Sequence, residues 1–266
     1  SACALLTPTL QKATDEASLS TVLQLFIKLS GDETPMVRRA AARVLAPFAE
    51  AVSSLPDGLE ILLRDVIPQF KRLGMEDDAA SVQHIITQSA GRVIALLSNE
   101  EFTTHLLGYV RWCCESPSWR IRSLIAPQFG RFCAVIGSPE ACVAKLLHMF
   151  LGLLVDPERD VRADACRGSV ELHSAVGHDA FVEHVVPKLA RCTLDESHVV
   201  RNAYAEVCND IISALYEGNK GASKGGDSVT DLVTKTFNLM TDDNAEVRTK
   251  VMTAVQRLTE RASENR

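Results

Sequence analysis

A short motif that recurs six times constrains the fold more than any other feature of this sequence. Each copy starts with Asp, or with Ser in one case, and ends in a β-branched residue followed by Arg or Gln. The β-branched residues are spaced 45, 39, 40, 39 and 47 residues apart, which indicates stacked copies of one supersecondary unit. The six copies are DETPMVR from Asp32, DDAASVQ from Asp77, SPSWRIR from Ser116, DPERDVR from Asp156, DESHVVR from Asp195 and DDNAEVR from Asp242.

The segments on either side of each motif have the periodicity of amphipathic helices. Apolar residues from Val37 to Val52 recur every three or four positions, and a similar stripe runs from Ile121 to Ile136. Each unit is therefore expected to be an A helix, a tight turn and a B helix, in an all-α superhelix of about six helix pairs. A period near 40 is typical of HEAT repeats. The predicted A/B pairs are 18–30/35–53, 59–73/80–97, 102–115/119–136, 140–154/159–176, 179–193/198–215 and 228–240/245–262.

Other segments complete the predicted organisation, which is one solenoid over residues 1–266. Residues 1–17 resemble the end of a B helix, so we expect the chain to be a piece of a longer array. The Gly-rich stretch at 216–227 is predicted to form a flexible loop. Pro68 and Pro187 precede their turns by similar distances, and we expect them to bend their A helices without ending them.

Composition argues against several functions. The net charge of −6 and the pI near 5.7 argue against a groove that follows nucleic-acid phosphates. No apolar run is long enough to span a membrane, and the first residues lack the pattern of a secretion signal. Eight cysteines without CxxC spacing predict buried free thiols in a reducing compartment, the cytoplasm and also the nucleus.

We find no catalytic motif: there is no P-loop, no Gly-x-Ser-x-Gly and no HExxH. His173, His178 and His184 lie five and six residues apart, so they are not expected to share a helix face as metal ligands. The chain is therefore predicted to be no enzyme, with no cofactor, no metal and no small-molecule substrate.

The turns carry the predicted binding surface. Six turn windows contain fourteen acidic residues against two basic ones, Arg120 and Arg159, so stacking would align an acidic edge. For each motif's Asp and the basic residue six positions later, we favour a structural ladder between repeats. Trp119 is explained equally well by partner contact or by local packing. The predicted partner-binding residues are Asp32, Glu33, Thr34, Pro35, Met36, Glu76, Asp77, Ser118, Trp119, Glu158, Arg159, Glu196 and His198.

Three stretches resemble the scaffold (structural A) subunit of protein phosphatase 2A. They are DETPMVRRAAARVLAPFAEAV from Asp32, ESPSWRIRS from Glu115 and LLVDPERDVRADA from Leu153, and the resemblance weakens after Gly218. In that family the turns of a HEAT-repeat horseshoe bind regulatory subunits through N-terminal repeats and the catalytic subunit through C-terminal ones. The resemblance therefore implies a scaffold that docks regulatory (B-type) subunits. Gln83 and Ser116 depart from the family pattern.

Other solenoid functions are alternatives. A transport adaptor resembling importin-β shares the architecture and an acidic surface, but it does not account for the three matching stretches. Deoxyhypusine hydroxylase binds iron with His-Glu pairs, and this sequence has no His-Glu dipeptide. A HEAT-like DNA glycosylase would need a basic concave groove, which the net charge opposes.

Overall fold

A computed structural model describes residues 2–13, 15–218 and 226–264, which form helices and turns without a β-strand. The chain divides into two compact units, unit 1 (Ser1–Ser116) and unit 2 (Pro117–Arg266). The predicted third helix pair is divided between them, with its A helix in unit 1 and its B helix in unit 2. In the part that the structure describes, no helix is both long and apolar enough to cross a membrane.

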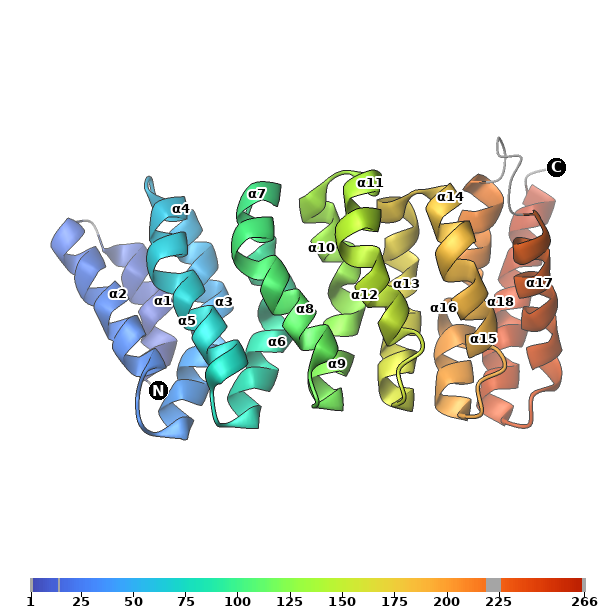
Figure 1. The fold of residues 1–266 in the computed structure, drawn as a ribbon, viewed down its shortest axis with the longest axis horizontal. Coiled ribbons are helices and arrows are strands. Elements are labelled where there is room, and N and C mark those ends of the chain that lie inside the picture. The colour runs from blue at the N-terminus through green and yellow to red at the C-terminus, as the bar shows by residue number, and fades with distance from the viewer. Residues whose placement is uncertain (1, 14, 219–225, 265–266) are drawn as a thin grey trace. The chain divides into compact units, whose positions relative to one another are not determined.

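Unit 1 has two layers of helices (Figure 1). In one layer α3 packs against α1 on one side and α6 on the other, while α2 packs on both α1 and α3. Phe26 of α2 stacks on Phe48 of α3 with ring centroids 4.4 Å apart, and both rings are fully buried. The helices are α1 (Ala2–Lys12), α2 (Glu16–Ser30), α3 (Pro35–Ser53), α4 (Gly58–Ile61), α5 (Ile67–Lys71), α6 (Ala80–Ile94), α7 (Asn99–Glu101) and α8 (Leu107–Glu115).

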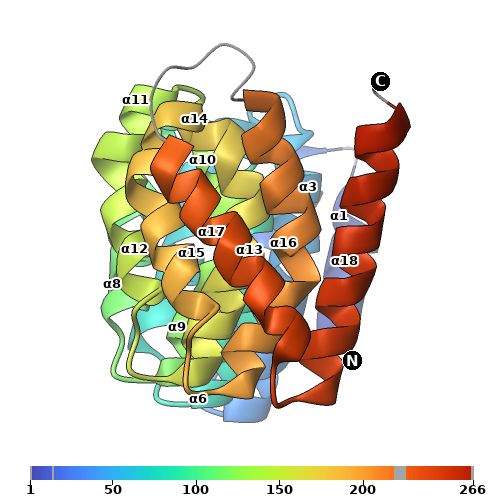
Figure 2. The ribbon, with the colours of Figure 1, turned by 90° about the vertical axis from the view of Figure 1, so that its right-hand side faces the viewer.

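Unit 2 repeats the arrangement. Its B helices pack in the order α10, α13, α16 and α18, and α15 contacts α17 in the other layer (Figure 2). The helices are α9 (Trp119–Ile125), α10 (Phe129–Ile136), α11 (Pro139–Cys142), α12 (His148–Leu153), α13 (Arg159–Val176), α14 (His178–Ala180), α15 (Val186–Cys192), α16 (His198–Gly218), α17 (Gly226–Asn238) and α18 (Ala245–Glu264). Short 3-10 turns, Ala126–Gln128 and Leu239–Thr241, follow α9 and α17.

The A helices continue past their prolines, as predicted. Pro68 and Pro187 are the second residues of α5 and α15, and each follows a π-helical turn, Leu62–Val66 or Phe181–Val185. Proline has no N–H and clashes with the carbonyl four residues earlier, and a wider turn accommodates both effects. Similar π-helical turns at Phe102–Leu106 and Val143–Leu147 are not followed by a proline, so proline is not required for the widened turn in these A helices.

Several predicted boundaries differ from the structure by two or three residues, and the A helix predicted at 59–73, for example, continues to Glu76. Helix α6 ends at Ile94 instead of residue 97, because residues 95–97 turn towards α7. The predicted loop at 216–227 is too wide, since α16 extends to Gly218 and α17 begins at Gly226. The rest of that predicted loop, 219–225, lies outside the described residues.

All eight cysteines are free thiols, which confirms that part of the prediction. Seven are buried and Cys114 is half-buried. Burial raises the pKa of Cys113 and of Cys208 to about 12, so both stay protonated near neutral pH. These thiols fill the core.

Candidate protein-binding turns

Five of the six A–B turns are shaped by the Asp that begins their motif, and the third motif has Ser116 in its place. The Asp Oδ1 atom accepts a hydrogen bond from the backbone N–H two residues later, which fixes the turn just before the B helix. The N···O distances are 2.8 Å for Asp32 with Thr34, 2.9 Å for Asp77 with Ala79, 2.9 Å for Asp156 with Glu158, 2.9 Å for Asp195 with Ser197 and 2.8 Å for Asp242 with Asn244. The recurring Asp therefore has a role within its own turn, because its short side chain reaches the backbone N–H two residues later.

The basic residue six positions later closes the same turn. Its Nη1 atom donates to the carbonyl oxygen of the Asp, at 2.9 Å for Arg38, 2.8 Å for Arg162, 2.8 Å for Arg201 and 2.6 Å for Arg248. Gln83 makes the equivalent bond through its amide, with Nε2 2.9 Å from the Asp77 carbonyl oxygen. The change from Arg to Gln therefore preserves the turn.

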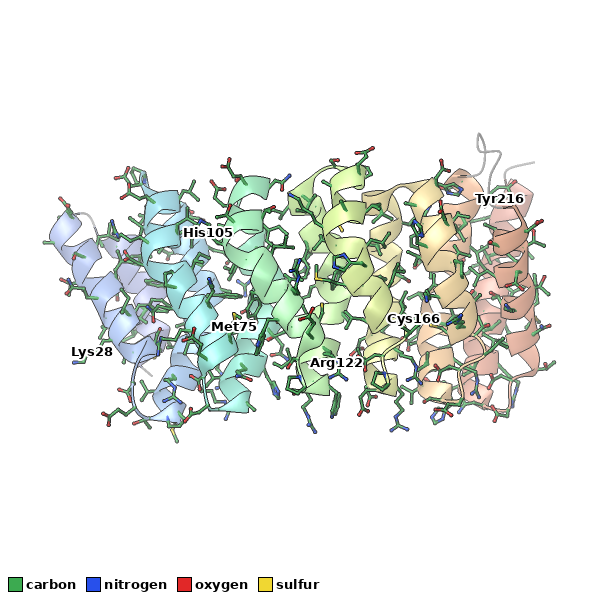
Figure 3. All side chains as sticks on the ribbon, viewed as in Figure 1. Lys28, Met75, His105, Arg122, Cys166 and Tyr216 are labelled. Atoms are coloured by element: carbon green, nitrogen blue, oxygen red, sulfur yellow. The ribbon has the colours of Figure 1, made fainter. Side chains whose placement is uncertain are left out.

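The remaining guanidinium nitrogens form the ladder between repeats. Each Arg pairs with the Asp of the following motif, and the Nε–Oδ2 distances are 2.7 Å for Arg38–Asp77, 2.6 Å for Arg122–Asp156, 2.7 Å for Arg162–Asp195 and 2.6 Å for Arg201–Asp242. These side chains are at most 14% exposed. Figure 3 shows Arg122 at the turn end of unit 2. The predicted ladder between repeats is confirmed for Arg38, Asp156, Arg162, Asp195, Arg201 and Asp242. Asp32 and Arg248, which were predicted with them, bond within their own turns.

One rung of the ladder lacks both charged residues. The second motif ends in Gln83 instead of Arg, and the next motif starts with Ser116 instead of Asp. Replacing only one member would leave the other charge without its partner in a poorly solvated place, which is more costly than replacing both. The two departures from the family pattern thus have a joint physical explanation.

The ladder changes the titration of its acids. Burial opposes ionisation of Asp77 and of Asp242, but it is outweighed by the combined effect of the arginine hydrogen bond, the backbone N–H two residues later and the arginine charge. The pKa of Asp77 is lowered, and that of Asp242 falls to about 2. Both carboxylates therefore remain charged and paired at neutral pH.

The ladder separates the predicted binding residues into two groups. The Asp77 carboxylate is only 2% exposed and is held by Arg38, and Asp32 is half-buried. In unit 1 the exposed residues are Glu33, Thr34, Pro35, Met36 and Glu76, and in unit 2 they are Glu158, Arg159, Glu196 and His198. Met36 is 78% exposed at the first turn of α3.

Trp119 and Ser118 are half-buried, unlike the other predicted turn residues. The guanidinium carbon of Arg120 lies 4.5 Å from the centroid of the Trp119 ring. A cation over an indole face is a favourable contact, so part of this ring already has a partner within unit 2. Local packing therefore accounts for part of the surface of Trp119.

Sequence reasoning missed several exposed turn residues. Leu194 is 67% exposed and Val155 is 45% exposed, each directly before the Asp of its motif. Asp78 and Asp243 follow the Asp of their motifs, and their side chains are 83% and 87% exposed. An apolar residue directly before a motif's Asp was the signal that could have found Leu194 and Val155, since it falls outside the helical stripe.

The two turns of unit 1 flank an acidic hollow of about 400 Å³. Glu33 lines it from the α2–α3 turn, and Glu76 and Asp78 line it from the second turn. Arg38 and Arg72 are its basic residues. Because Arg38 is already paired with Asp77, the hollow presents mainly acidic groups to an incoming protein.

His173 and His178 lie on different helices, α13 and α14, so they do not share one helix face. His173 Nε2 lies 3.3 Å from His178 Nδ1 at the end of α13, so these two side chains do meet. Residues five apart can do so because Gly177, at φ 82°, breaks the helix between them. Within the described ranges, no group of three His, Cys, Asp or Glu residues could hold a metal ion.

Comparison with known proteins agrees with this architecture. The HEAT repeat family model matches residues 22–52, which include most of α2 and almost all of α3. The crystal structure of Cex1p superposes with a TM-score of 0.65 at 16% identity, over 84% of this chain and 40% of that one. A designed armadillo repeat protein gives 0.53 at 15% identity, over 88% of this chain and 98% of that one. The chain therefore has the fold of an α-solenoid of stacked helical repeats, and residues 22–52 within it match the HEAT repeat.

A comparison of sequences finds a relative with higher identity than these structures have. The chain is 34% identical over 117 residues to the regulatory A subunit of protein phosphatase PP2A from Schizosaccharomyces pombe. The match covers 43% of this chain and 18% of that protein, so it spans less than a fifth of the relative's length.

Proposed function

We propose that this chain is a non-catalytic scaffold of a phosphatase 2A complex, and that its exposed turns dock regulatory (B-type) subunits. The catalytic subunit would be bound by repeats beyond this chain. Partial identity to the regulatory A subunit of a yeast phosphatase PP2A supports the choice of complex. The free cysteines favour a reducing compartment, so the proposal includes the cytoplasm as its place of action, with the nucleus as a second location.

One observation carries the proposal: the turns contain residues that the fold does not use. The Asp and Arg of each rung hold neighbouring repeats together, whereas Glu33, Met36 and Glu76 are exposed beside them in unit 1. An exposed apolar side chain among acidic ones is typical of a protein-binding patch. The acidic groups would steer a partner with a basic face.

The test is co-purification from native cell extract, using the tagged chain and two double variants. The binding variant is Glu33→Lys with Met36→Arg. The matched control is Glu100→Lys with Leu59→Arg, because these exposed residues, at the starts of α7 and α4, lie at the opposite end of the unit 1 helices (Figure 1). Both variants should melt at the wild-type temperature.

We expect the wild type and the control variant to retrieve phosphatase 2A regulatory subunits, and the binding variant to lose them at least tenfold. Equal retrieval by all three proteins would exclude the turns as the docking surface. Retrieval of nuclear-transport cargo in place of phosphatase subunits would favour the adaptor alternative.

A further inference from the structure

A second surface of unit 1 has the opposite charge to the turns. Helices α3 and α6 border a groove of about 530 Å³, which is large enough for several side chains of a ligand. Arg39 and Arg43 line it from α3, and Ser81, Gln88 and Arg92 line it from α6. We call this surface the basic groove.

Two arginines of the basic groove lack an acidic partner. Arg39 and Arg43 are exposed, and neither forms an ion pair with any residue in the part of the chain that the structure describes. Arg92 is different, because its Nε and Nη2 atoms donate to the two carboxylate oxygens of Glu50 at 2.9 and 2.8 Å. The groove therefore presents two guanidinium groups to solvent.

In unit 2 the arginine that is equivalent to Arg43 is paired with an acidic residue. Arg167 lies six residues after Val161, just as Arg43 lies six residues after Val37. Its Nε atom is 2.7 Å from Oε2 of Glu206, the residue six positions after the next motif's Val200. Lys250 also contacts Glu206 at 2.7 Å.

The residue of unit 1 that corresponds to Glu206 is Gln88, six positions after Val82. Arg43 therefore shares the groove with the neutral amide of Gln88, whereas Arg167 is paired with the carboxylate of Glu206. At equivalent positions of the repeat, the arginine charge is neutralised by Glu206 in unit 2 and is not neutralised in unit 1.

We propose that the basic groove binds an acidic segment of a partner protein. Arg39 and Arg43 are one helical turn apart, roughly 6 Å along α3. Alternate residues of an extended strand are spaced by about 7 Å, so two carboxylates of a Glu-x-Glu segment match the two guanidinium groups, each in a bidentate pair. Ser81 and Gln88 add hydrogen-bonding groups for the backbone of the segment.

A short peptide fits this surface better than a nucleic acid does. Two unpaired cations release few counterions, and the chain has a net charge of −6, which repels a long polyanion. The groove lies along α3 and α6, and Arg39 and Ser81 place one end of it near the starts of these helices. The inference rests on the arginines of the groove and does not require the proposed phosphatase role.

The test measures fluorescence polarisation of labelled octaglutamate, with octaglutamine as the neutral probe. Two changes act on the groove: Arg39→Gln with Arg43→Gln removes its charges, and Gln88→Glu places a carboxylate opposite Arg43, as in the Arg167–Glu206 pair. The matched controls are Arg131→Gln with Arg191→Gln, and Gln11→Glu, which make the same changes of charge at other exposed positions.

We expect the wild type to bind octaglutamate at least tenfold more tightly than octaglutamine, and more weakly as salt rises. Both groove variants should weaken binding at least tenfold, while both controls stay within twofold. The Gln88→Glu protein should melt no lower than the wild type, which separates lost binding from lost folding.

Three results would overturn the proposal. If octaglutamate binds no more tightly than octaglutamine, the groove is not a site for acidic peptides. If the groove and control variants lose binding equally, the binding depends on the net charge of the protein and not on the groove. Tighter binding of an eight-nucleotide oligothymidine, lost in the same groove variants, would assign the groove to nucleic acid.

Discussion

Asp242 and Asp243 both contact Arg201, but substitution of one should destabilise the protein much more than substitution of the other. Asp242 contacts Arg201 at 2.6 and 3.0 Å, and its side chain is 5% exposed. Asp243 contacts the same guanidinium but is 87% exposed. Asp242→Asn should therefore destabilise the protein much more than Asp243→Asn, although both remove one charge.

The pKa of Asp242 sets the magnitude. Burial opposes its ionisation, but Arg201 and the Asn244 N–H hold its pKa at about 2, against the ordinary value of 3.8. A shift of this size corresponds to about 2 kcal/mol of stability at pH 7. Because the folded pKa is the lower one, the contribution is present above pH 3.8 and is lost as the pH falls through 2. An exposed pair such as Asp243 contributes under about 1 kcal/mol.

The assay is urea denaturation followed by circular dichroism, at pH 7 and at pH 3. Asp242→Asn should lower the free energy of unfolding by about 2 kcal/mol at pH 7 and by roughly half as much at pH 3. Equal costs for the two variants at pH 7 would refute the reasoning, and so would a cost for Asp242→Asn that does not shrink in acid.

Further predictions concern packing and thiol chemistry. A Cβ at Gly168 would lie 2.9 Å from the backbone of Ala126 and Pro127, so Gly168→Ala should cost roughly 1–3 kcal/mol in thermal unfolding, whereas Gly152→Ala, with nothing within 4 Å, should stabilise by up to about 1 kcal/mol. Phe48→Ala should cost about 3–5 kcal/mol in the same measurement, because it removes a fully buried ring stacked on Phe26. Cys113 and Cys208 should react with a thiol reagent at pH 8 only after denaturation, since burial raises the pKa of each to about 12; rapid labelling of the folded protein would contradict this.

Most of the fold was predictable because the motif marks the start of every B helix. The bounds predicted for α3 and α13 agree with the structure: Pro35 is suited to the first residue of a helix, and Gly177 follows the last residue of α13. The end of α6 was not predictable in this way. Leu96 and Leu97 continue its apolar stripe, yet they lie in the turn that leads to α7.

The ladder was predictable in kind, but its partners were not. The repeated Asp and Arg indicated a structural role, whereas the pairing of Arg38 with Asp77, 39 residues away, depends on how consecutive repeats stack. Asp77 was consequently included among the binding residues although its carboxylate is buried.

The basic groove was hidden by the acidic net charge. Arg39 and Arg43 lie one turn apart on the same helix, and neither has an acidic residue three or four positions away. That pattern was visible in the sequence. Only the structure shows that α6, the helix beside α3, places no acidic residue in the groove.

The central claim is that the turns, with their exposed acidic and apolar residues, form the docking surface. Amide hydrogen exchange of the chain with and without a purified phosphatase 2A regulatory subunit tests it most directly. The account predicts protection of peptides that contain residues 31–36 and 76–80 in unit 1, and 155–158 and 194–198 in unit 2. Protection confined to the loops at the other ends of the helices, residues 54–58, 95–98 and 177–178, would contradict it.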